Sequence, residues 1–252
     1  MARIDYDDHT AAAFKRVREV PREGLDQWRA ALSRHLNPWP GMTLLDIGAG
    51  TGAFATAFSD WFGVRVLAIE PSAAMRAQIP RRPDIEVLDG HASALPLPDG
   101  SADAAWLSTV IHHVPDLAAA ASEIRRVLRP GAPVLIRQPF PGRCEGIELV
   151  RWFPETTRTI DTFPSVDQTC HAFAIAGFPH AALERVPQTR PGTLAEFLTE
   201  VDTFRHADTT MRNLTEDEFA RGKEHLRRAA ADEAESGRAE PRTTWLDLLV
   251  LR

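Results

Sequence analysis

Two acidic residues and three glycines are the groups in this chain most able to do chemistry. Residues 44–53 read LLDIGAGTGA, so Asp46 closes an apolar run, and Glu70 closes the next one. Three glycines follow at every second position: Gly48, Gly50 and Gly52. Glycine reaches positive φ and has no Cβ, which lets a ligand lie against its backbone. A helix after the loop adds unpaired N–H groups and a partial positive charge, so the pattern predicts a nucleotide-binding loop.

The elements that must position this loop alternate along the chain. Strands are predicted at residues 42–47, 64–69, 85–88, 102–107 and 132–137, and helices at 53–62, 72–78 and 116–128. Ser72 and Asp116 are the expected N-caps, since their side chains can accept hydrogen bonds from the first turn. Strict alternation implies right-handed crossovers and a parallel sheet with helices on both faces. Ligands bind such sheets at the carboxyl ends of the strands, where the glycine loop lies.

The segments on either side of this alternating region follow a looser pattern. Two amphipathic helices separated by Pro21 are predicted within residues 7–36. Beyond residue 137 we expect a helix at 166–176, a strand at 181–186, charged helices at 194–204 and 216–231, and a strand at 243–251. If the two strands pair, the charged helices are an insertion and not a second domain.

We therefore expect a single domain over residues 1–252. Its parts are an N-terminal helical cap (1–40), a cofactor-binding core (41–137), substrate lid insertions (138–164 and 190–240) and a closing strand (241–252). The first insertion holds arginines and aromatic residues that suit an acidic substrate or, equally, a solvated surface: Arg143, Arg151, Trp152, Phe153 and Arg158.

Composition excludes several classes of protein. Apolar residues make up 44% of the 252 residues, enough for a full core. The formal net charge is −6 and no basic tract occurs, so we expect no nucleic-acid partner. The two cysteines, Cys144 and Cys170, predict neither a disulfide framework nor a zinc site, and we expect no metal. Without a signal peptide or an apolar stretch of about 18 residues, the expected location is the cytoplasm.

The glycine loop alone leaves the nucleotide open. It also satisfies the dinucleotide pattern G-x-G-x-x-G/A, and Glu70 lies near the place of a ribose-binding acid, so NAD-dependent redox chemistry is one reading. Asp46 favours another, because a carboxylate just before the loop would repel a pyrophosphate and attract the ammonium group of an amino acid. The sequence also offers no evident Tyr-Lys pair for hydride chemistry.

Three downstream segments favour a different cofactor. They are residues 89–103 (DGHASALPLPDGSAD), 111–116 (IHHVPD) and 123–131 (EIRRVLRPG). With the glycine loop, their order and spacing resemble class I S-adenosylmethionine-dependent methyltransferases, in the small-molecule branch that includes the ubiquinone and menaquinone methyltransferases. The resemblance covers residues 40–140. It implies an α/β fold: a Rossmann-like, doubly wound sheet of seven strands with the last strand antiparallel and with helical lid insertions.

By resemblance, the loops after the strands supply most of the cofactor contacts. The expected set is Asp46, Gly48, Ala49, Gly50, Gly52, Glu70, Pro71, His91, Ala92 and Ser108. Asp46 and the glycines would hold the amino-acid part, and Glu70 would accept hydrogen bonds from both ribose hydroxyls. His91 stands where the family has an aspartate for the adenine amino group. A neutral imidazole can accept that bond in one tautomer only.

Four further residues are candidates by their place in the family pattern. Arg18 and Tyr6 belong to an N-terminal segment that would hold the cofactor carboxylate and cap the site, and the alternative for Arg18 is a solvated helix face. One of His112 and His113 would contact the substrate or act as a general base. The alternative for this pair is simple packing in a helical turn.

The sequence thus predicts in-line transfer of a methyl group from S-adenosylmethionine to an oxygen, nitrogen or carbon atom of an enclosed small molecule. S-Adenosylhomocysteine would be the product. Two alternatives stay open because a fold does not fix a function: an NAD-dependent oxidoreductase, and a non-methylating relative that binds the same cofactor. The sequence identifies neither the acceptor nor the oligomeric state.

Overall fold

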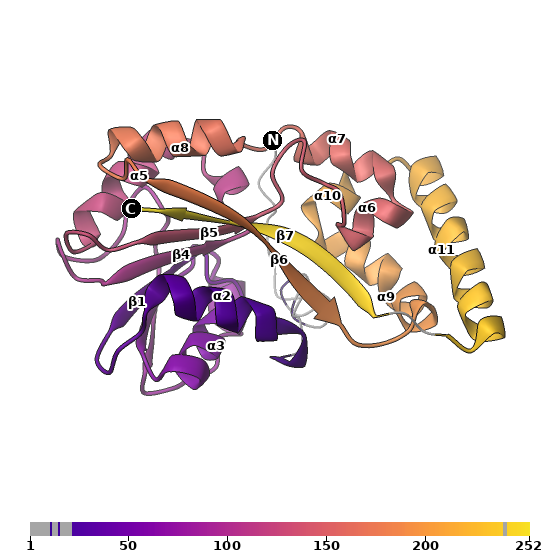
Figure 1. Cartoon of the computed structure of the whole chain (residues 1–252), viewed down its shortest axis with the longest axis horizontal. Coiled ribbons are helices and arrows are strands. Elements are labelled where there is room, and N and C mark those ends of the chain that lie inside the picture. Colours follow the sequence, from indigo (N-terminus) through magenta and orange to yellow (C-terminus); the bar gives the residue numbers. More distant parts are fainter. Residues whose placement is uncertain (1–10, 12–14, 16–21, 239–240) are drawn as a thin grey trace.

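A seven-stranded sheet runs through the molecule, with the strand order β3-β2-β1-β4-β5-β7-β6 (Figure 1). The computed structural model describes residues 11, 15, 22–238 and 241–252. The strands are β1 (Thr43–Ile47), β2 (Arg65–Ile69), β3 (Ile85–Leu88), β4 (Ala104–Ser108), β5 (Val134–Gln138), β6 (Ala181–Arg190) and β7 (Arg242–Leu251). Strands β1 to β5 are parallel, and β7 pairs antiparallel with both β5 and β6. The predicted sheet with its antiparallel last strand is confirmed.

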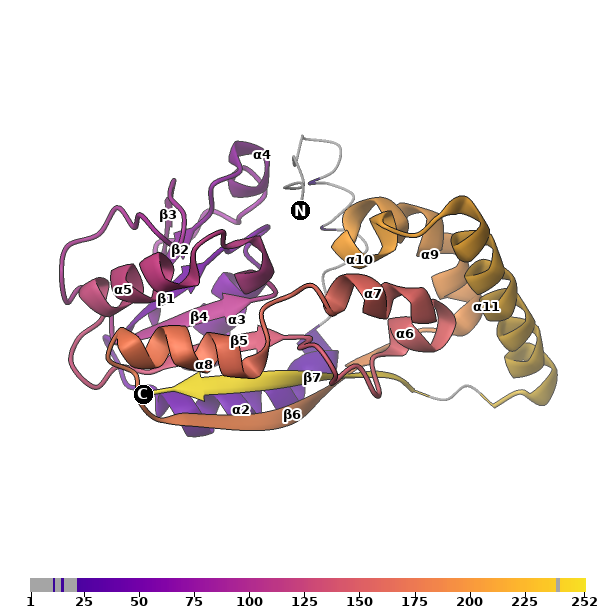
Figure 2. The ribbon, with the colours of Figure 1, turned by 90° about the horizontal axis from the view of Figure 1, so that it is seen from above.

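Helices cover both faces of this sheet (Figures 1 and 2). On one face lie α2 (Asp26–Leu36) and α3 (Ala53–Phe62), and on the other α5 (Leu117–Val127) and α8 (Val166–Ile175). Because strand side chains alternate in direction, Leu44 and Trp106 join the apolar core under α2 and α3, whereas Leu45 and Leu107 join the core under α5. No helix of the described residues is long and apolar enough to cross a membrane.

Short-range signals set several helix ends as expected. The Ser72 hydroxyl accepts a hydrogen bond from the Met75 N–H at 3.3 Å, at the start of α4 (Ala73–Arg76). The Asp116 carboxylate accepts one from the Ala119 N–H at 3.0 Å, at the start of α5. The helix predicted at 72–78 is too long, however. Helix α4 is a single turn that ends at Arg76, and the chain continues in turns, where the Gln78 N–H donates to the carbonyl of Met75 at 2.9 Å and the Ile79 N–H to that of Arg76 at 3.1 Å.

Strand β6 is longer than predicted. The sequence suggests 181–186, but the strand continues to Arg190 and pairs with β7 along its whole length, from Ala181 opposite Leu251 to Arg190 opposite Arg242. Pro187 breaks the sequence pattern and yet is tolerated, because β6 is an edge strand and one of its sides needs no partner. The two C-terminal strands therefore pair, as they must if the charged helices between them are an insertion. The organisation of residues 1–252 as one domain stays a prediction.

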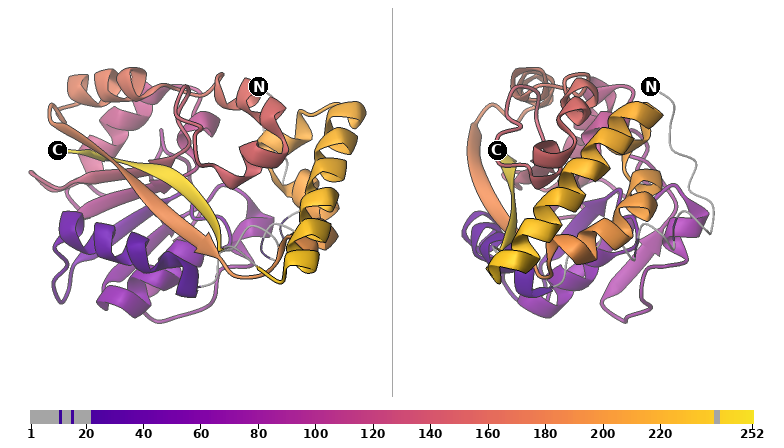
Figure 3. Two further views of the ribbon diagram at one scale, coloured as in Figure 1. Left: turned by 45° about the vertical axis from the view of Figure 1, so that its right-hand side comes forward. Right: turned by 90° about the vertical axis from the view of Figure 1, so that its right-hand side faces the viewer.

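Five helices form a layer beyond β6 and β7, which we call the lid (Figure 3). They are α6 (Glu148–Trp152), α7 (Thr157–Ile160), α9 (Leu194–Ala207), α10 (Thr209–Arg212) and α11 (Glu216–Ser236). The sequence pattern predicts neither α6 nor α7. The lid has an apolar core of its own, which includes Trp152, Phe153, Phe197, Phe204, Met211 and Phe219. Gly222 lets α11 approach this core, since a Cβ there would lie 2.2 Å from Cδ1 of Phe153.

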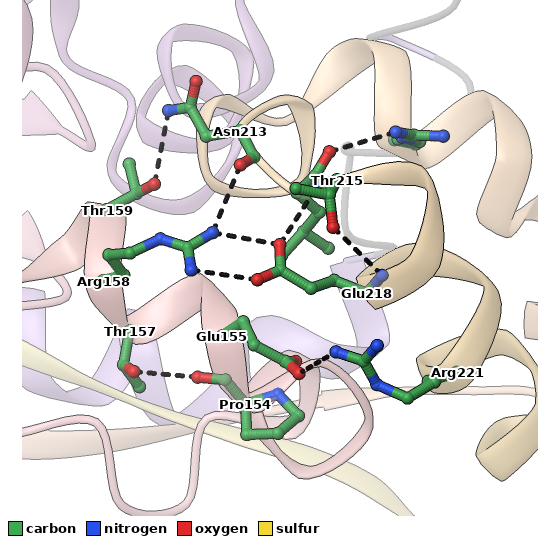
Figure 4. Close-up of polar contacts among 11 residues, drawn as sticks. Pro154, Glu155, Thr157, Arg158, Thr159, Asn213, Thr215, Glu218 and Arg221 are labelled. Carbon is green, nitrogen blue, oxygen red and sulfur yellow. Dashed lines mark hydrogen bonds and ion pairs between the residues drawn. The ribbon is translucent and has the colours of Figure 1, made fainter.

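Ion pairs on the surface of the lid join the same two stretches of sequence (Figure 4). Arg158 of α7 donates to both carboxylate oxygens of Glu218 on α11, at 2.9 and 3.0 Å. Arg221 of α11 donates to Glu155 at 3.1 Å. Residues 148–160 and 194–236, far apart in the chain, therefore pack together through a shared core and a shared surface.

Candidate active site

The glycine loop between β1 and α3 lies at the carboxyl ends of the parallel strands. Its three glycines have positive φ: 71° at Gly48, 57° at Gly50 and 81° at Gly52. Gly48 and Ala49 donate their N–H groups to the carbonyl of Ile69 at 2.8 and 3.0 Å, which ties the loop to β2. A Cβ on Gly48 would lie 2.5 Å from Cγ2 of Val110. Glycine is therefore required at this position for both conformation and close approach.

Asp46 is a buried carboxylic acid at the end of β1, with only 2% of its surface exposed. Burial, and secondarily the charge of Glu70, raise the pKa of Asp46 from 3.8 to about 8, while a hydrogen bond from the Ala55 N–H opposes the shift. Its Oδ2 has no hydrogen-bond partner among the described residues. Burial of a carboxylate oxygen without a hydrogen-bond partner lowers the free energy of unfolding. Asp46 is therefore a candidate for ligand binding, because a donor on a ligand would satisfy Oδ2.

Glu70 is the second buried acid of the site. One of its oxygens accepts a hydrogen bond from the Gly50 N–H and the other from the Ser72 N–H, both at 2.9 Å. Burial raises the pKa of Glu70 above its ordinary value, and these two hydrogen bonds and the charge of Arg76 limit the rise. The carboxylate thus joins the glycine loop to the end of β2.

Both acids face a cavity of about 1030 Å³ that extends from the strand ends to the lid. The predicted residues that line it are Asp46, Gly48, Ala49, Gly50, Glu70, Pro71, His91, Ala92, Ser108, His112 and His113. Gly52 is not among the lining residues. It is the N-cap of α3, where a Cβ would lie 2.8 Å from Cγ2 of Ile79. Tyr6 and Arg18 lie outside the described residues, so their assignments stay predictions.

His91 and Ala92 occupy a tight turn that follows β3. The Ala94 N–H donates to the carbonyl of His91 at 2.9 Å, and this turn leaves the His91 side chain exposed and Ala92 buried. The turn places both residues at the cavity. Their adenine-binding roles stay predictions.

His112 and His113 lie in a short 3₁₀-helix (Ile111–His113) after β4. The ring of His112 stacks on Phe163 with centroids 4.1 Å apart, and the two histidine rings are 4.0 Å apart. The fully buried side chain of Gln138 contacts Nδ1 of His112, through Nε2 at 3.0 Å and through Oε1 at 3.4 Å. Gln138 is a functional candidate that the sequence pattern does not single out, although its place at the end of β5 is a usable signal.

Arg137, the neighbour of Gln138, lines the cavity from the opposite face of β5. Its guanidinium donates to the Ser108 hydroxyl at 3.1 Å and to Oε1 of Gln188 at 2.5 Å. It also lies over the rings of Trp28 and Phe54, 5.1 and 5.6 Å from their centroids. No local sequence pattern singles out Arg137, because Ser108, Gln188, Trp28 and Phe54 come from distant parts of the chain.

The arginines after β5, for which the sequence leaves an acidic-substrate site and a solvated surface equally open, lie outside the cavity. Arg143 forms a two-pronged ion pair with the buried Asp247, at 2.7 and 2.9 Å. Arg158 is paired with Glu218, and Arg151 lies over the ring of Trp152. None of the three lines the cavity. Their surroundings support a structural role in place of an acidic-substrate site.

Comparison with solved structures defines the class of fold. A putative methyltransferase from an antibiotic biosynthesis pathway of Anabaena variabilis matches 93% of this chain and 98% of its own, with a TM-score of 0.72 at 22% identity. A phosphoethanolamine N-methyltransferase of Haemonchus contortus, solved with S-adenosylhomocysteine, matches 99% of this chain and 58% of its own, with a TM-score of 0.63 at 18% identity. The fold is that of the class I methyltransferases.

Comparison of sequences finds similar methyltransferases. Residues 45–136 match the family model of a methyltransferase domain. A demethylmenaquinone methyltransferase of Beutenbergia cavernae is 34% identical over 147 residues, which cover 54% of this chain and 61% of that protein. The chain thus spans about 60% of the length of such relatives. The matched region, residues 45–136, is thus similar to a methyltransferase domain, and it holds the glycine loop, Glu70 and the two histidines.

Proposed function

We propose that this chain transfers a methyl group from S-adenosylmethionine to a small molecule enclosed in the cavity between the strand ends and the lid. The observation that carries the proposal is the pair of buried acids beside the glycine loop. Asp46 presents a carboxylate oxygen without a partner among the described residues, and Glu70 presents two oxygens held by backbone N–H groups. These groups match an amino acid and a ribose, respectively.

The residues present also fit this cofactor better than a dinucleotide. An ammonium group beside Asp46 would stabilise its ionised form and relieve the cost of a buried, unpartnered carboxylate. A pyrophosphate there would add negative charge next to two buried acids. Each oxygen of Glu70 accepts one backbone N–H and keeps a lone pair for a ribose hydroxyl.

S-Adenosylmethionine, when bound, supplies a methyl group already activated by its positive sulfur. The chain has to align the acceptor with that group and exclude water, and positioning of this kind is worth about 7–11 kcal/mol. The lid covers the far side of the cavity with apolar side chains, among them Ile160, Phe197 and Phe204. These side chains would hold the body of the acceptor and keep the cavity dry.

His112 is placed to move a proton in this cavity. Where Oε1 of Gln138 accepts from Nδ1–H, the unprotonated nitrogen of the neutral His112 ring is Nε2, which is the atom that would take a proton from an acceptor hydroxyl or amine. Where Nε2 of Gln138 donates to Nδ1, the neutral ring carries its proton on Nε2 and is a hydrogen-bond donor at that atom. The orientation of the Gln138 amide therefore sets the chemical role of His112.

Calorimetric titration of the wild-type protein with S-adenosylhomocysteine and, separately, with NAD⁺ tests the proposal. We expect micromolar binding of S-adenosylhomocysteine and no heat from NAD⁺. The reverse result would establish the oxidoreductase alternative. A non-methylating relative would bind S-adenosylhomocysteine but transfer no label from [methyl-³H]S-adenosylmethionine to small molecules of a cell extract.

A further inference from the structure

We infer that Arg126 of α5, together with Glu123, positions the turn that binds the adenine base of the cofactor. The inference rests on the proposed function, because it concerns the same cofactor. Neither residue lines the cavity, so both are positioning residues that act through the segment after β3. The argument combines the order of the strand ends, the build of the turn and the contacts that hold it to α5.

The order of the strands places this turn beside the third part of the cofactor. Strands β1, β2 and β3 are neighbours in the sheet, and Asp46, Glu70 and residues 91–93 lie at or after their carboxyl ends in that order. Neighbouring strands are about 4.8 Å apart. In S-adenosylmethionine the ribose links the amino acid to adenine. With the ammonium group at Asp46 and the ribose at Glu70, adenine therefore extends toward residues 91–93, which line the cavity.

The turn at residues 91–94 closes on itself. Two backbone hydrogen bonds join His91 and Ala94, at 2.9 and 3.4 Å. Ala92 is buried in the apolar core under α5, whereas His91 and Ala94 are exposed. Short exposed segments with few buried contacts open locally at little cost in free energy. The position of this turn at the cavity therefore depends on how the next residues are held.

Arg126 ties the residues after the turn to α5. Its guanidinium donates to the carbonyls of Leu95 and Leu97, at 3.2 and 2.8 Å, and to the carboxylate of Asp99 at 2.7 Å. It also donates to the two oxygens of Glu123, at 2.9 and 2.7 Å. These five contacts use all five N–H donors of a guanidinium, so its plane is fixed.

Glu123 holds the same point of the chain by its other backbone group. Its Oε1 accepts a hydrogen bond from the Leu95 N–H at 2.8 Å, while Arg126 bonds the Leu95 carbonyl. The ion pair thus fixes the peptide groups on both sides of the residue that directly follows the turn. Hydrogen bonds to charged groups are stronger than neutral ones, and a binding site needs supports of this kind to hold its contacts within about 0.5 Å.

The neighbouring Arg125 offers a matched control on the same helix. Its guanidinium donates to the carbonyl of Leu128 at 3.1 Å and lies over the ring of Phe178, 5.9 Å from the centroid. These partners lie outside the segment that follows β3. Loss of Arg125 therefore removes an arginine from α5 and leaves the support of the turn in place.

The test is a calorimetric titration with S-adenosylhomocysteine and with S-inosylhomocysteine, in which a carbonyl replaces the amino group of the base. We expect wild type to bind the adenine ligand about tenfold or more tightly. Arg126→Met should lose most of this preference, through weaker binding of S-adenosylhomocysteine. Arg126→Lys should keep part of it, because an ammonium group can still donate to a carbonyl of the segment. Arg125→Met should match wild type.

The ratio of the two affinities separates positioning of the turn from general loss of structure. Equal weakening of both ligands by Arg126→Met, with the preference intact, overturns the inference. Wild-type affinities in Arg126→Met, or no preference in wild type, also overturn it. If wild type binds neither ligand, the proposed function itself fails. Thermal unfolding verifies that each variant is folded, and Glu123→Gln, with the same expected loss of preference, decides the question if Arg126→Met is not.

Discussion

The strand-end part of the cavity and the surface of the lid use charge in opposite ways. In the strand-end part of the cavity, where we propose that the cofactor binds, Asp46 and Glu70 are buried, and neither forms a salt bridge with a described residue. In the lid, Arg158 with Glu218 and Arg205 with Glu216 form close, exposed ion pairs. Exposed pairs of this kind contribute little to stability, whereas a buried carboxylate without a counter-charge destabilises the fold. The comparison teaches that charges the fold leaves uncompensated indicate ligand binding better than an abundance of charge.

The largest effects are expected from two matched glycine substitutions, one beside the buried acids and one in the lid. Gly48→Ala brings a Cβ within 2.5 Å of Val110 at a φ of 71°, and Gly222→Ala brings one within 2.2 Å of Phe153 in the lid. We expect each to lower the free energy of unfolding by about 2–3 kcal/mol, measured in urea. Only Gly48→Ala should also abolish binding of S-adenosylhomocysteine. Equal loss of affinity in both variants would show that the lid is needed to form the cofactor-binding part of the cavity.

Glu70→Gln should weaken binding of S-adenosylhomocysteine and should lower stability less than the glycine substitutions do. Both oxygens of Glu70 accept backbone N–H groups, and glutamine replaces one of them with a donor that faces another donor. We expect about tenfold or more weaker binding of S-adenosylhomocysteine by calorimetry. Glu218→Gln in the lid is the matched control and should bind normally. An unchanged affinity in Glu70→Gln would remove Glu70 from the ribose site.

The pKa of Asp46 predicts how stability depends on pH. Because its folded-state pKa is raised from 3.8 to about 8, the folded state holds a proton that the unfolded state has lost between these values. Its contribution to stability is therefore complete below about pH 4 and is lost as the pH rises toward 8. Urea unfolding of wild type and Asp46→Asn at pH 5 and pH 8 should show a smaller decline in the variant. Parallel declines would contradict the raised pKa.

The smallest expected effect concerns the tautomer of His112. In Gln138→Glu the new carboxylate can only accept, so it should fix the proton on Nδ1 of His112 and raise the pKa of the ring. Gln138→Leu should release the tautomer. Histidine ¹⁵N NMR measures both, with His225 in the lid as the internal control. If neither substitution moves the His112 resonances, Gln138 does not position this ring.

The same contrast explains how much could be predicted from the sequence. The glycine loop, Glu70 and the caps at Ser72 and Asp116 depend on contacts within a short stretch of chain or between neighbouring strands, so motif spacing predicts them. The bounds of α3, Ala53–Phe62, also match those that the sequence predicts.

Arg137 and the lid side of the cavity depend on contacts between distant parts of the chain, which no local sequence pattern predicts. Arg137 meets Gln188 and Trp28 only after β7 has paired with both β5 and β6. Helix α6 is only five residues long and is stabilised by the core that it shares with α9 and α11. Helix α7, of four residues, is tied to α11 by the ion pair of Arg158 with Glu218. The sequence leaves the role of Arg143 and Arg158 open, because their partners, Asp247 and Glu218, lie far away in the chain.

The most direct test of the central claim compares the affinity of wild type and Asp46→Asn for S-adenosylhomocysteine by calorimetry at pH 8. Asparagine keeps the size of the side chain and removes the charge that would meet the ligand's ammonium group. The account predicts micromolar binding by wild type and about tenfold or more weaker binding by the variant, with the variant at least as stable to urea. Equal affinity of the two folded proteins would contradict the assignment of the buried acid to the cofactor.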